Sequence, residues 1–124
     1  MILGTGIDLS SIGRIKAALE RSGDAFLRRV FTAAERQYAL AHREPERPLA
    51  ARFAAKEAAI KALGGWAPTM SWQDMEILRA AEGPPVLLLH GGARARADAM
   101  GVRAIHVSLT HEADMAAAMV VLED

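Results

Sequence analysis

The chain has 124 residues, 52% of them apolar and 5% aromatic, and its 15 basic and 15 acidic side chains give zero net charge. This length and composition predict one folded domain, residues 1–124, and exclude intrinsic disorder. Without cysteine the chain has no disulfide or thiolate metal site, and without an apolar run of roughly 20 residues we expect a cytoplasmic protein that does not span a membrane.

The first half of the chain is expected to contain one strand and then four helical segments, at residues 2–9, 11–19, 24–30, 33–42 and 50–63. Ser10 or Ser11 can cap the first helix, which stops at Gly23. Thr32 and Glu35 have the spacing of a capping box and predict the start of the third.

The helix at residues 50–63 is the most informative segment. Pro45 and Pro48 separate it from the preceding helix, and Gly64 ends it. Its alanines recur with helical spacing and form a small-residue face that can press closely against another element. Glu57 and Lys61, one turn apart, project from the same side of this otherwise apolar helix.

The second half is expected to contain strands at residues 75–79, 86–90, 103–110 and 115–122, and a helix at residues 93–100. Turns are predicted at residues 83–85 and 111–114. We therefore expect an α+β fold, with helices concentrated early and an antiparallel sheet late.

The charge is distributed unevenly along the chain. Residues 1–62 carry eleven Lys and Arg against seven Asp and Glu, whereas residues 63–124 carry four against eight. Arg14, Arg21 and Arg28 lie in one early segment, the first two on one helix face. A local basic face on a neutral protein indicates an acidic partner rather than a nucleic acid, because nucleic-acid-binding domains usually carry a basic excess throughout. A solvated face without a partner explains the same charges.

Three charged residues are candidates for catalysis. Asp8 lies where the first strand is expected to end, and folding could bring it to Glu57 and Lys61. Two carboxylates and an amine could hold a divalent cation and a phosphorylated substrate, which suggests phosphoryl-group chemistry. Each also has a structural alternative: Glu57 and Lys61 as a surface salt bridge, and Asp8 as a helix cap.

Histidine and serine give weaker signals. His106 and His111 are five residues apart, so a strand places them on opposite faces, which argues against a paired histidine metal site. Ser108, His111 and Asp114 invite comparison with a hydrolase triad, but the context of a nucleophile elbow is missing.

Three blocks of sequence resemble the signature blocks of the holo-acyl-carrier-protein synthases, the small single-domain class of 4′-phosphopantetheinyl transferases. The blocks are Gly-Ile-Asp-Leu at 6–9 with Arg-Ile at 14–15, the segment 52–64, and His-Val-Ser-Leu-Thr-His at 106–111. They occur in the family's order at near-family spacing, and the middle block is the most specific. Residues 75–77 and 83–85 also resemble the family's strand and its Gly-x-Pro turn.

The resemblance implies the 4′-phosphopantetheinyl transferase fold, an antiparallel sheet packed with a long Ala-rich helix. It implies transfer of 4′-phosphopantetheine from coenzyme A to a serine of apo-acyl carrier protein, in support of fatty acid biosynthesis. Asp8 and Glu57 match the family's magnesium ligands, and Lys61 matches its lysine near the scissile bond. Positions that the family uses for coenzyme A fall at Arg52, Lys61, Gly64, Pro85, His106 and His111.

The resemblance further implies that Arg14, Arg21 and Arg28 meet the acidic helix of the carrier protein, and that the protein is a homotrimer with sites at subunit interfaces. Two departures stand out: Ser10 replaces a third acid of larger relatives, and residues 65–68 differ from the expected Gly/Thr-rich loop. Two alternatives stay open, the same chemistry on a peptide-synthetase or polyketide carrier domain, and a non-catalytic binder of an acidic helical partner.

Overall fold

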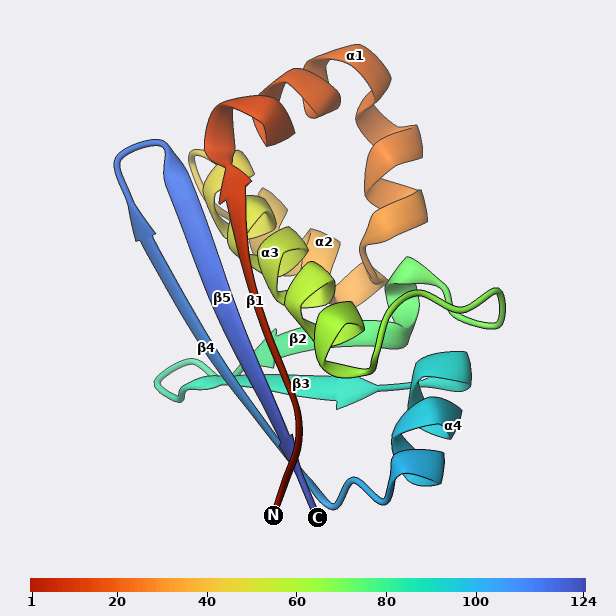
Figure 1. The fold of residues 1–124 in the computed structure, drawn as a ribbon. Helices are drawn as coiled ribbons and strands as arrows, with labels where there is room; N and C mark the ends of the chain where they lie inside the picture. Colours follow the sequence, from red (N-terminus) through yellow and green to blue (C-terminus); the bar gives the residue numbers. More distant parts are fainter.

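The computed structural model describes residues 1–124 and combines helices with antiparallel strands, which confirms the expected α+β class (Figure 1). Its elements in chain order are β1 (Ile2–Ser11), α1 (Ile12–Val30), α2 (Ala33–Leu40), α3 (Glu46–Ala62), the 3-10 helix η1 (Trp72–Asp74), β2 (Met75–Arg79), β3 (Pro85–Leu89), α4 (Gly91–Met100), β4 (Ala104–Glu112) and β5 (Met115–Glu123). None of these helices is both long and apolar enough to cross a membrane.

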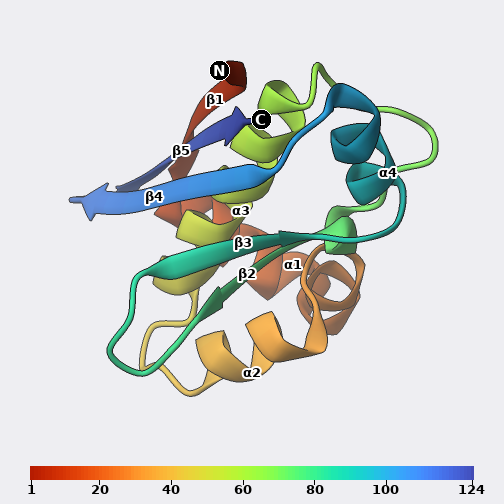
Figure 2. The same cartoon turned by 90° about the horizontal axis from the view of Figure 1, so that it is seen from below.

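The long helix α3 lies at the centre of the fold. Strands β1, β5 and β4 form a three-stranded antiparallel sheet in that order, and β2 pairs with β3 in a separate two-stranded sheet. Seen from below, α3 lies between the three-stranded sheet and the β2–β3 hairpin (Figure 2). The expectation of a sheet confined to the late half needs correction, because the first strand pairs with the last one.

Two glycines let β1 run directly against the backbone of α3. A Cβ atom at Gly6 would lie 1.8 Å from the carbonyl oxygen of Ala58, and one at Gly4 would lie 2.1 Å from that of Ala62. Glycine is therefore required at both positions, and the small-residue face of the helix is used as expected. Because side chains alternate along a strand, Asp8 projects from the same side of β1 as these glycines.

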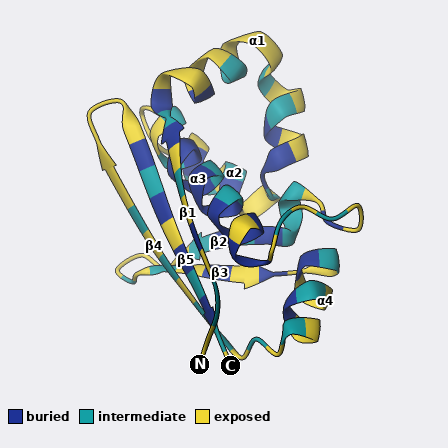
Figure 3. Cartoon of the chain, in the orientation of Figure 1, coloured by how far each residue is buried: buried dark blue, intermediate teal, exposed yellow.

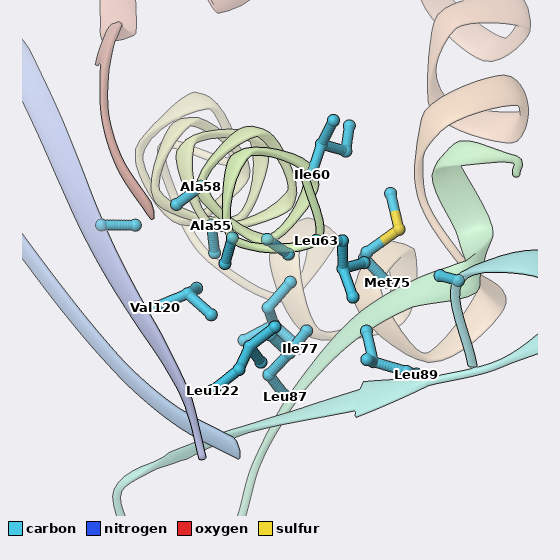
Figure 4. Packing of buried hydrophobic residues seen from close by; sticks show 14 of the residues in the cluster. Ala55, Ala58, Ile60, Leu63, Met75, Ile77, Leu87, Leu89, Val120 and Leu122 are labelled. Atoms are coloured by element: carbon cyan, nitrogen blue, oxygen red, sulfur yellow. The ribbon is translucent and has the colours of Figure 1, made fainter. Parts of the chain in front are cut away.

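The main hydrophobic core fills the space between α3 and the two sheets. Val120 and Leu122 from β5 meet Ile77 from β2 and Leu87 from β3, and all four side chains are buried (Figure 4). A second cluster packs α1 and α2 onto the beginning of α3. As a result α3 is buried along most of its length, whereas α1 exposes its outer side (Figure 3).

The expected helix signals are confirmed at two helix starts and at one interruption. The hydroxyl oxygen of Ser11 caps α1 by accepting a 3.2 Å hydrogen bond from the N–H of Arg14. Thr32 and Glu35 form both hydrogen bonds of a capping box at the start of α2. Gly23 interrupts α1 with a non-helical φ of 46° and ψ of −116°, a conformation that favours glycine, so two helical pieces meet at a kink there, as expected.

Several element boundaries differ from the expected ones. Helix α3 begins directly after Pro45, so Pro48 lies in its first turn, where the missing N–H costs nothing. Strand β1 continues past Asp8 to Ser11, and β3 begins at Pro85. Strand β4 includes His111, which leaves only residues 113–114 as the turn before β5.

Candidate active site

Asp8 and Lys61 meet where β1 crosses α3. The Nζ atom of Lys61 lies 3.1 Å from Oδ1 of Asp8 and donates a 2.9 Å hydrogen bond to the carbonyl oxygen of Ile7. Lys61 therefore pairs with Asp8, and the structure shows no ion pair between Lys61 and Glu57. The simple i,i+4 surface pair was the wrong alternative. The side chains of Asp8 and Lys61 are 19% and 54% exposed, so a ligand can reach both.

Glu57 lies within the electrostatic influence of the same two residues. Burial raises the pKa of Glu57, the charge of Asp8 raises it further, and the charge of Lys61 opposes both effects. The repulsion indicates that the carboxylates from β1 and α3 share one region of the surface. A carboxyl group with a raised pKa beside a second carboxylate is typical of a functional site. A bound cation would neutralise the negative charge that burial and the second carboxylate disfavour.

The donor set fits a hard divalent cation. Asp8 and Glu57 offer carboxylate oxygens, the ligands that magnesium prefers. The chain has no group of three or more His, Cys, Asp or Glu side chains placed to hold a metal ion by themselves. Magnesium usually keeps several waters and binds through one or two carboxylates together with substrate phosphates. Ser10, in place of the third acid, is buried on the same side of β1.

A second group of predicted residues lines a basic hollow of about 480 Å³. Arg52 is only 3% exposed, and its guanidinium carbon lies 4.1 Å from the centre of the Tyr38 ring. The Nε atom of Arg52 is buried without a hydrogen-bond partner. His111, at the end of β4, lines the same hollow together with His42, Arg47 and Arg79. An anionic ligand would satisfy the orphaned guanidinium N–H.

The remaining predicted contacts to coenzyme A lie in three different places. Gly64 follows α3 with a φ of 93°, a value that glycine adopts without strain. Arg96 of α4 fixes this turn by donating a 2.8 Å hydrogen bond to the carbonyl oxygen of Leu63. His106 points away from the core, with Nε2 2.7 Å from Oε1 of Glu123. Pro85 opens β3, in the hairpin beside β4.

One chain does not bring all of these residues together. Asp8 and Lys61 lie at the β1 edge of the three-stranded sheet, whereas His111 and the basic hollow lie at its β4 edge, on the far side of β5. The carboxylates and the basic hollow are thus two separate groups within the protomer. Figure 1 shows the two edge strands on either side of β5.

The triad-like set of Ser108, His111 and Asp114 is not assembled. Ser108 lies on the outer, exposed face of β4, and His111 lies on the opposite face beside Leu109. The carboxylate of Asp114 accepts a 3.4 Å hydrogen bond from the hydroxyl of Ser11 instead. These three residues therefore do not form a Ser-His-Asp arrangement within the chain.

Arg14, Arg21 and Arg28 are all exposed on α1. Arg28 forms an exposed ion pair with Asp24, its Nε 2.7 Å from Oδ2, whereas Arg14 and Arg21 form no ion pair. The early basic segment is therefore a solvent-facing surface on the outer side of the fold (Figure 3).

Two features of this region escaped the sequence analysis. Arg79, at the end of β2, joins the basic hollow although it lies far along the chain, and no local pattern indicates this. Phe53 stacks on Trp72 with ring centroids 5.2 Å apart, and Trp66 lies 5.5 Å from Trp72. Phe53 lies one helical turn before Glu57, but no local pattern indicates its stacking on the remote Trp72.

Comparison with known proteins identifies the family. Residues 4–118 match the 4′-phosphopantetheinyl transferase superfamily. A holo-[acyl-carrier-protein] synthase from Solidesulfovibrio magneticus is 54% identical, with 99% of each chain covered. The crystal structure of the synthase from Neisseria meningitidis superposes with a TM-score of 0.89 at 33% identity, over all of both chains. That of the Helicobacter pylori enzyme in complex with coenzyme A gives 0.84 at 29% identity, covering 96% of this chain and 99% of the other. The chain therefore belongs to the 4′-phosphopantetheinyl transferase superfamily.

Proposed function

We propose that this protein is a holo-acyl-carrier-protein synthase, which transfers 4′-phosphopantetheine from coenzyme A to a serine of apo-acyl carrier protein and releases 3′,5′-ADP. The observation that carries the proposal is the convergence of Asp8, Glu57 and Lys61 from β1 and α3. Two carboxylates for a cation and a lysine for a phosphate are the groups that phosphoryl transfer requires. The relatives that carry the synthase name match along nearly their whole length.

In this proposal Asp8 and Glu57 hold magnesium. When bound, the cation would neutralise the pyrophosphate of coenzyme A and favour ionisation of the attacking serine hydroxyl. The serine oxygen forms a bond to the phosphorus that carries the pantetheine, and the bond from that phosphorus to the 3′,5′-ADP oxygen breaks. The serine hydroxyl proton passes to solvent water as its oxygen bonds to phosphorus. Lys61 stabilises the negative charge that grows on the leaving phosphate.

We place the 3′,5′-ADP end of coenzyme A at the basic hollow. Arg52 supplies an unpaired guanidinium N–H there, and Arg47, Arg79 and His111 add further donors around it. Guanidinium groups suit phosphate because their donors are planar and stay charged. We assign Gly64, Pro85 and His106 to the edges of the same substrate, as the family resemblance implies.

A complete site needs more than one copy of the chain. The carboxylates and the basic hollow lie at opposite edges of the sheet, so one substrate can span them only if a neighbouring copy supplies the second group. The outer face of this sheet is uncovered and apolar, with Ile7, Leu9 and Met119 exposed by 65%, 66% and 47%. Exposed apolar surface of this kind marks an interface. A homotrimer with sites between subunits fits both observations.

The acceptor is expected to dock on α1. Arg14, Arg21 and Arg28 form an exposed basic face on a chain whose net charge is zero, which suits an acidic carrier protein. We infer a cytoplasmic enzyme that serves fatty acid biosynthesis, and we regard peptide-synthetase and polyketide carrier domains as alternative acceptors.

The test is a mass measurement on the acceptor. The protein is incubated with coenzyme A, magnesium chloride and apo-acyl carrier protein, and the carrier should gain the mass of phosphopantetheine. Parallel reactions with a peptide-synthetase carrier domain define the acceptor class, and Asp8→Asn serves as the inactive control. Binding of the carrier without any mass increment would instead support the non-catalytic alternative.

A further inference from the structure

A completely buried ion pair joins α2 to α3, the helix that carries Glu57 and Lys61. Lys56 precedes Glu57 in α3, and its Nζ atom lies 2.8 Å from Oε1 of Glu35 in α2, with both side chains 0% exposed. Neither residue faces solvent, so neither can touch coenzyme A or the carrier protein. A buried ion pair is costly to form and contributes little net stability compared with apolar residues of the same size. Its presence therefore calls for a reason other than stability.

All hydrogen-bonding groups of this pair are satisfied. Lys56 donates to Glu35, to the carbonyl oxygen of Trp72 at 3.1 Å, and to the carbonyl oxygen of Met75. Glu35 in turn accepts hydrogen bonds of 2.9 Å from the N–H groups of Thr32 and Ile77. The network thus ties together α2, α3, η1 and β2 at one point, and it uses all three protons of the lysine.

Helix α3 needs such a directional contact. Its buried side chains are mostly alanines, and they lie on several of its faces rather than along one stripe. A helix with similar small side chains in several directions gains nearly the same apolar burial in more than one rotation about its axis. Consecutive residues of a helix point about 100° apart, so the direction of Lys56 fixes the direction of Glu57. Single buried polar groups are known to fix register in this way.

We propose that Lys56 and Glu35 are positioning residues of the transferase site, which set the rotation of α3 and thereby aim Glu57 at the metal and the substrate. The same pair holds the backbone of Trp72, so it also sets the stack of Trp72 on Phe53, one turn before Glu57. This inference rests on the proposed function, in which Glu57 is a magnesium ligand.

The test removes the charges without leaving one of them buried alone. In Lys56→Met/Glu35→Gln both partners are neutral and similar in volume, and we expect a folded protein with a lower melting temperature, because the carbonyl oxygens of Trp72 and Met75 lose their donor. The magnesium concentration for half-maximal activity should rise at least tenfold and kcat should fall at least tenfold. Glu35→Gln alone should act in the same direction and also lower the melting temperature strongly, because it leaves the charge of Lys56 buried without its partner.

Two measurements separate positioning from general stability. Trp66 and Trp72 are the only tryptophans in the chain, and both belong to the aromatic stack, so near-ultraviolet circular dichroism reports on it directly. The double variant should change this signal. Leu122→Ala, which creates a cavity on the β5 side of α3, is the matched control. It should lower the melting temperature but leave the half-saturating magnesium concentration and the tryptophan signal unchanged.

Folded charge-neutral variants with wild-type magnesium dependence, kcat and tryptophan signal would overturn the proposal. If the double variant does not fold, Glu35→Asp, which keeps both charges but shortens the carboxylate side chain, decides by the same three readouts. Failure of the proposed function would look different: the wild-type protein itself would not modify the carrier. In that case, calorimetric titration with magnesium chloride and the tryptophan signal still compare the variants, because neither measurement needs turnover.

Discussion

The ionised carboxylate of Glu57 is needed for the proposed activity but lowers the stability of the folded protein. Burial and the charge of Asp8 raise its pKa, which means that folding disfavours its ionised form. We expect Glu57→Gln to lower transfer activity by roughly a hundred- to a thousand-fold, the usual effect of removing one preorganised electrostatic group. The variant should melt no earlier than the wild type at neutral pH, because it removes the disfavoured charge. Activity assays and thermal melts test both parts.

The same pKa shift predicts two pH dependences of opposite sign. A carboxyl group whose pKa is raised by folding destabilises the native state when ionised, so its contribution to stability improves as pH falls through the raised pKa. Magnesium binding needs the ionised form and should weaken over the same range. Glu57→Gln should lose the stability change, and a variant that retained the wild-type pH profile of melting would contradict this assignment.

Lys61 has a structural role and a proposed catalytic role, and the two roles differ in the free energy that each contributes. Its ion pair with Asp8 is largely exposed and should be worth about 0–1 kcal/mol of stability. A cation that faces the leaving phosphate is worth roughly 3–4 kcal/mol in the transition state. We therefore expect Lys61→Met to lower kcat about a hundred-fold or more while the melting temperature changes little. Early melting with a normal kcat would assign Lys61 to structure alone.

At the scale of elements, the contact between β1 and α3 delivers Asp8 to the site. Gly6→Ala would place a methyl group 1.8 Å from the carbonyl oxygen of Ala58, so the strand must move away from the helix. We expect a loss of about 1–3 kcal/mol in stability, and a loss of activity in the protein that still folds. Gly83→Ala, whose Cβ would lie 3.3 Å from that of Ala80, is the matched control and should have little effect. Equal melting temperatures for the two variants would refute the close contact.

The basic face of α1 makes a separate prediction about carrier binding. Arg14→Glu should raise KM for the carrier protein more than it lowers kcat, and wild-type affinity should weaken as salt shortens the Debye length to about 8–10 Å. Arg103→Glu, an equally exposed charge reversal outside α1, serves as the control. Kinetics at several salt concentrations test this, and indifference to both charge and salt would exclude α1 as the docking surface.

The sequence predicted elements well where local chemistry determines them, and less well where distant segments decide. The capping box at Thr32 and the strand at residues 75–79 follow from neighbouring residues and are confirmed. The pairing of β1 with β5 and the entry of Arg79 into the basic hollow depend on contacts between remote segments. The burial of Lys56 could not be predicted from the sequence, because a lysine in a helix is normally exposed to solvent. Only the fold shows that Glu35, a residue of another helix, pairs with it in the core.

At the scale of the whole molecule, the proposed assembly predicts that two inactive variants can restore activity when they are combined in one oligomer. Glu57→Gln damages the carboxylate group, and His111→Ala with Arg79→Ala damages the basic hollow at the other edge of the sheet. If each site joins one group from each of two subunits, co-expression of the two inactive chains should restore some sites. In a cyclic oligomer with random mixing, about a quarter of the sites would be intact. Recovery of activity in the purified mixture measures this, and a mixture no more active than its components would place both groups in one subunit's site.

The two ends of the chain meet at the foot of the three-stranded sheet (Figure 1). The amino group of Met1 lies 2.6 Å from Oδ1 of Asp124, and the N–H of Asp124 donates a 3.1 Å hydrogen bond to the carbonyl oxygen of Met1. The backbone is thus almost a closed ring, and ends this close are a property that makes circular permutation and insertion into a host protein tolerable. A permutant joined at Met1 and Asp124 and opened at the exposed Gly101 would keep every strand and helix whole.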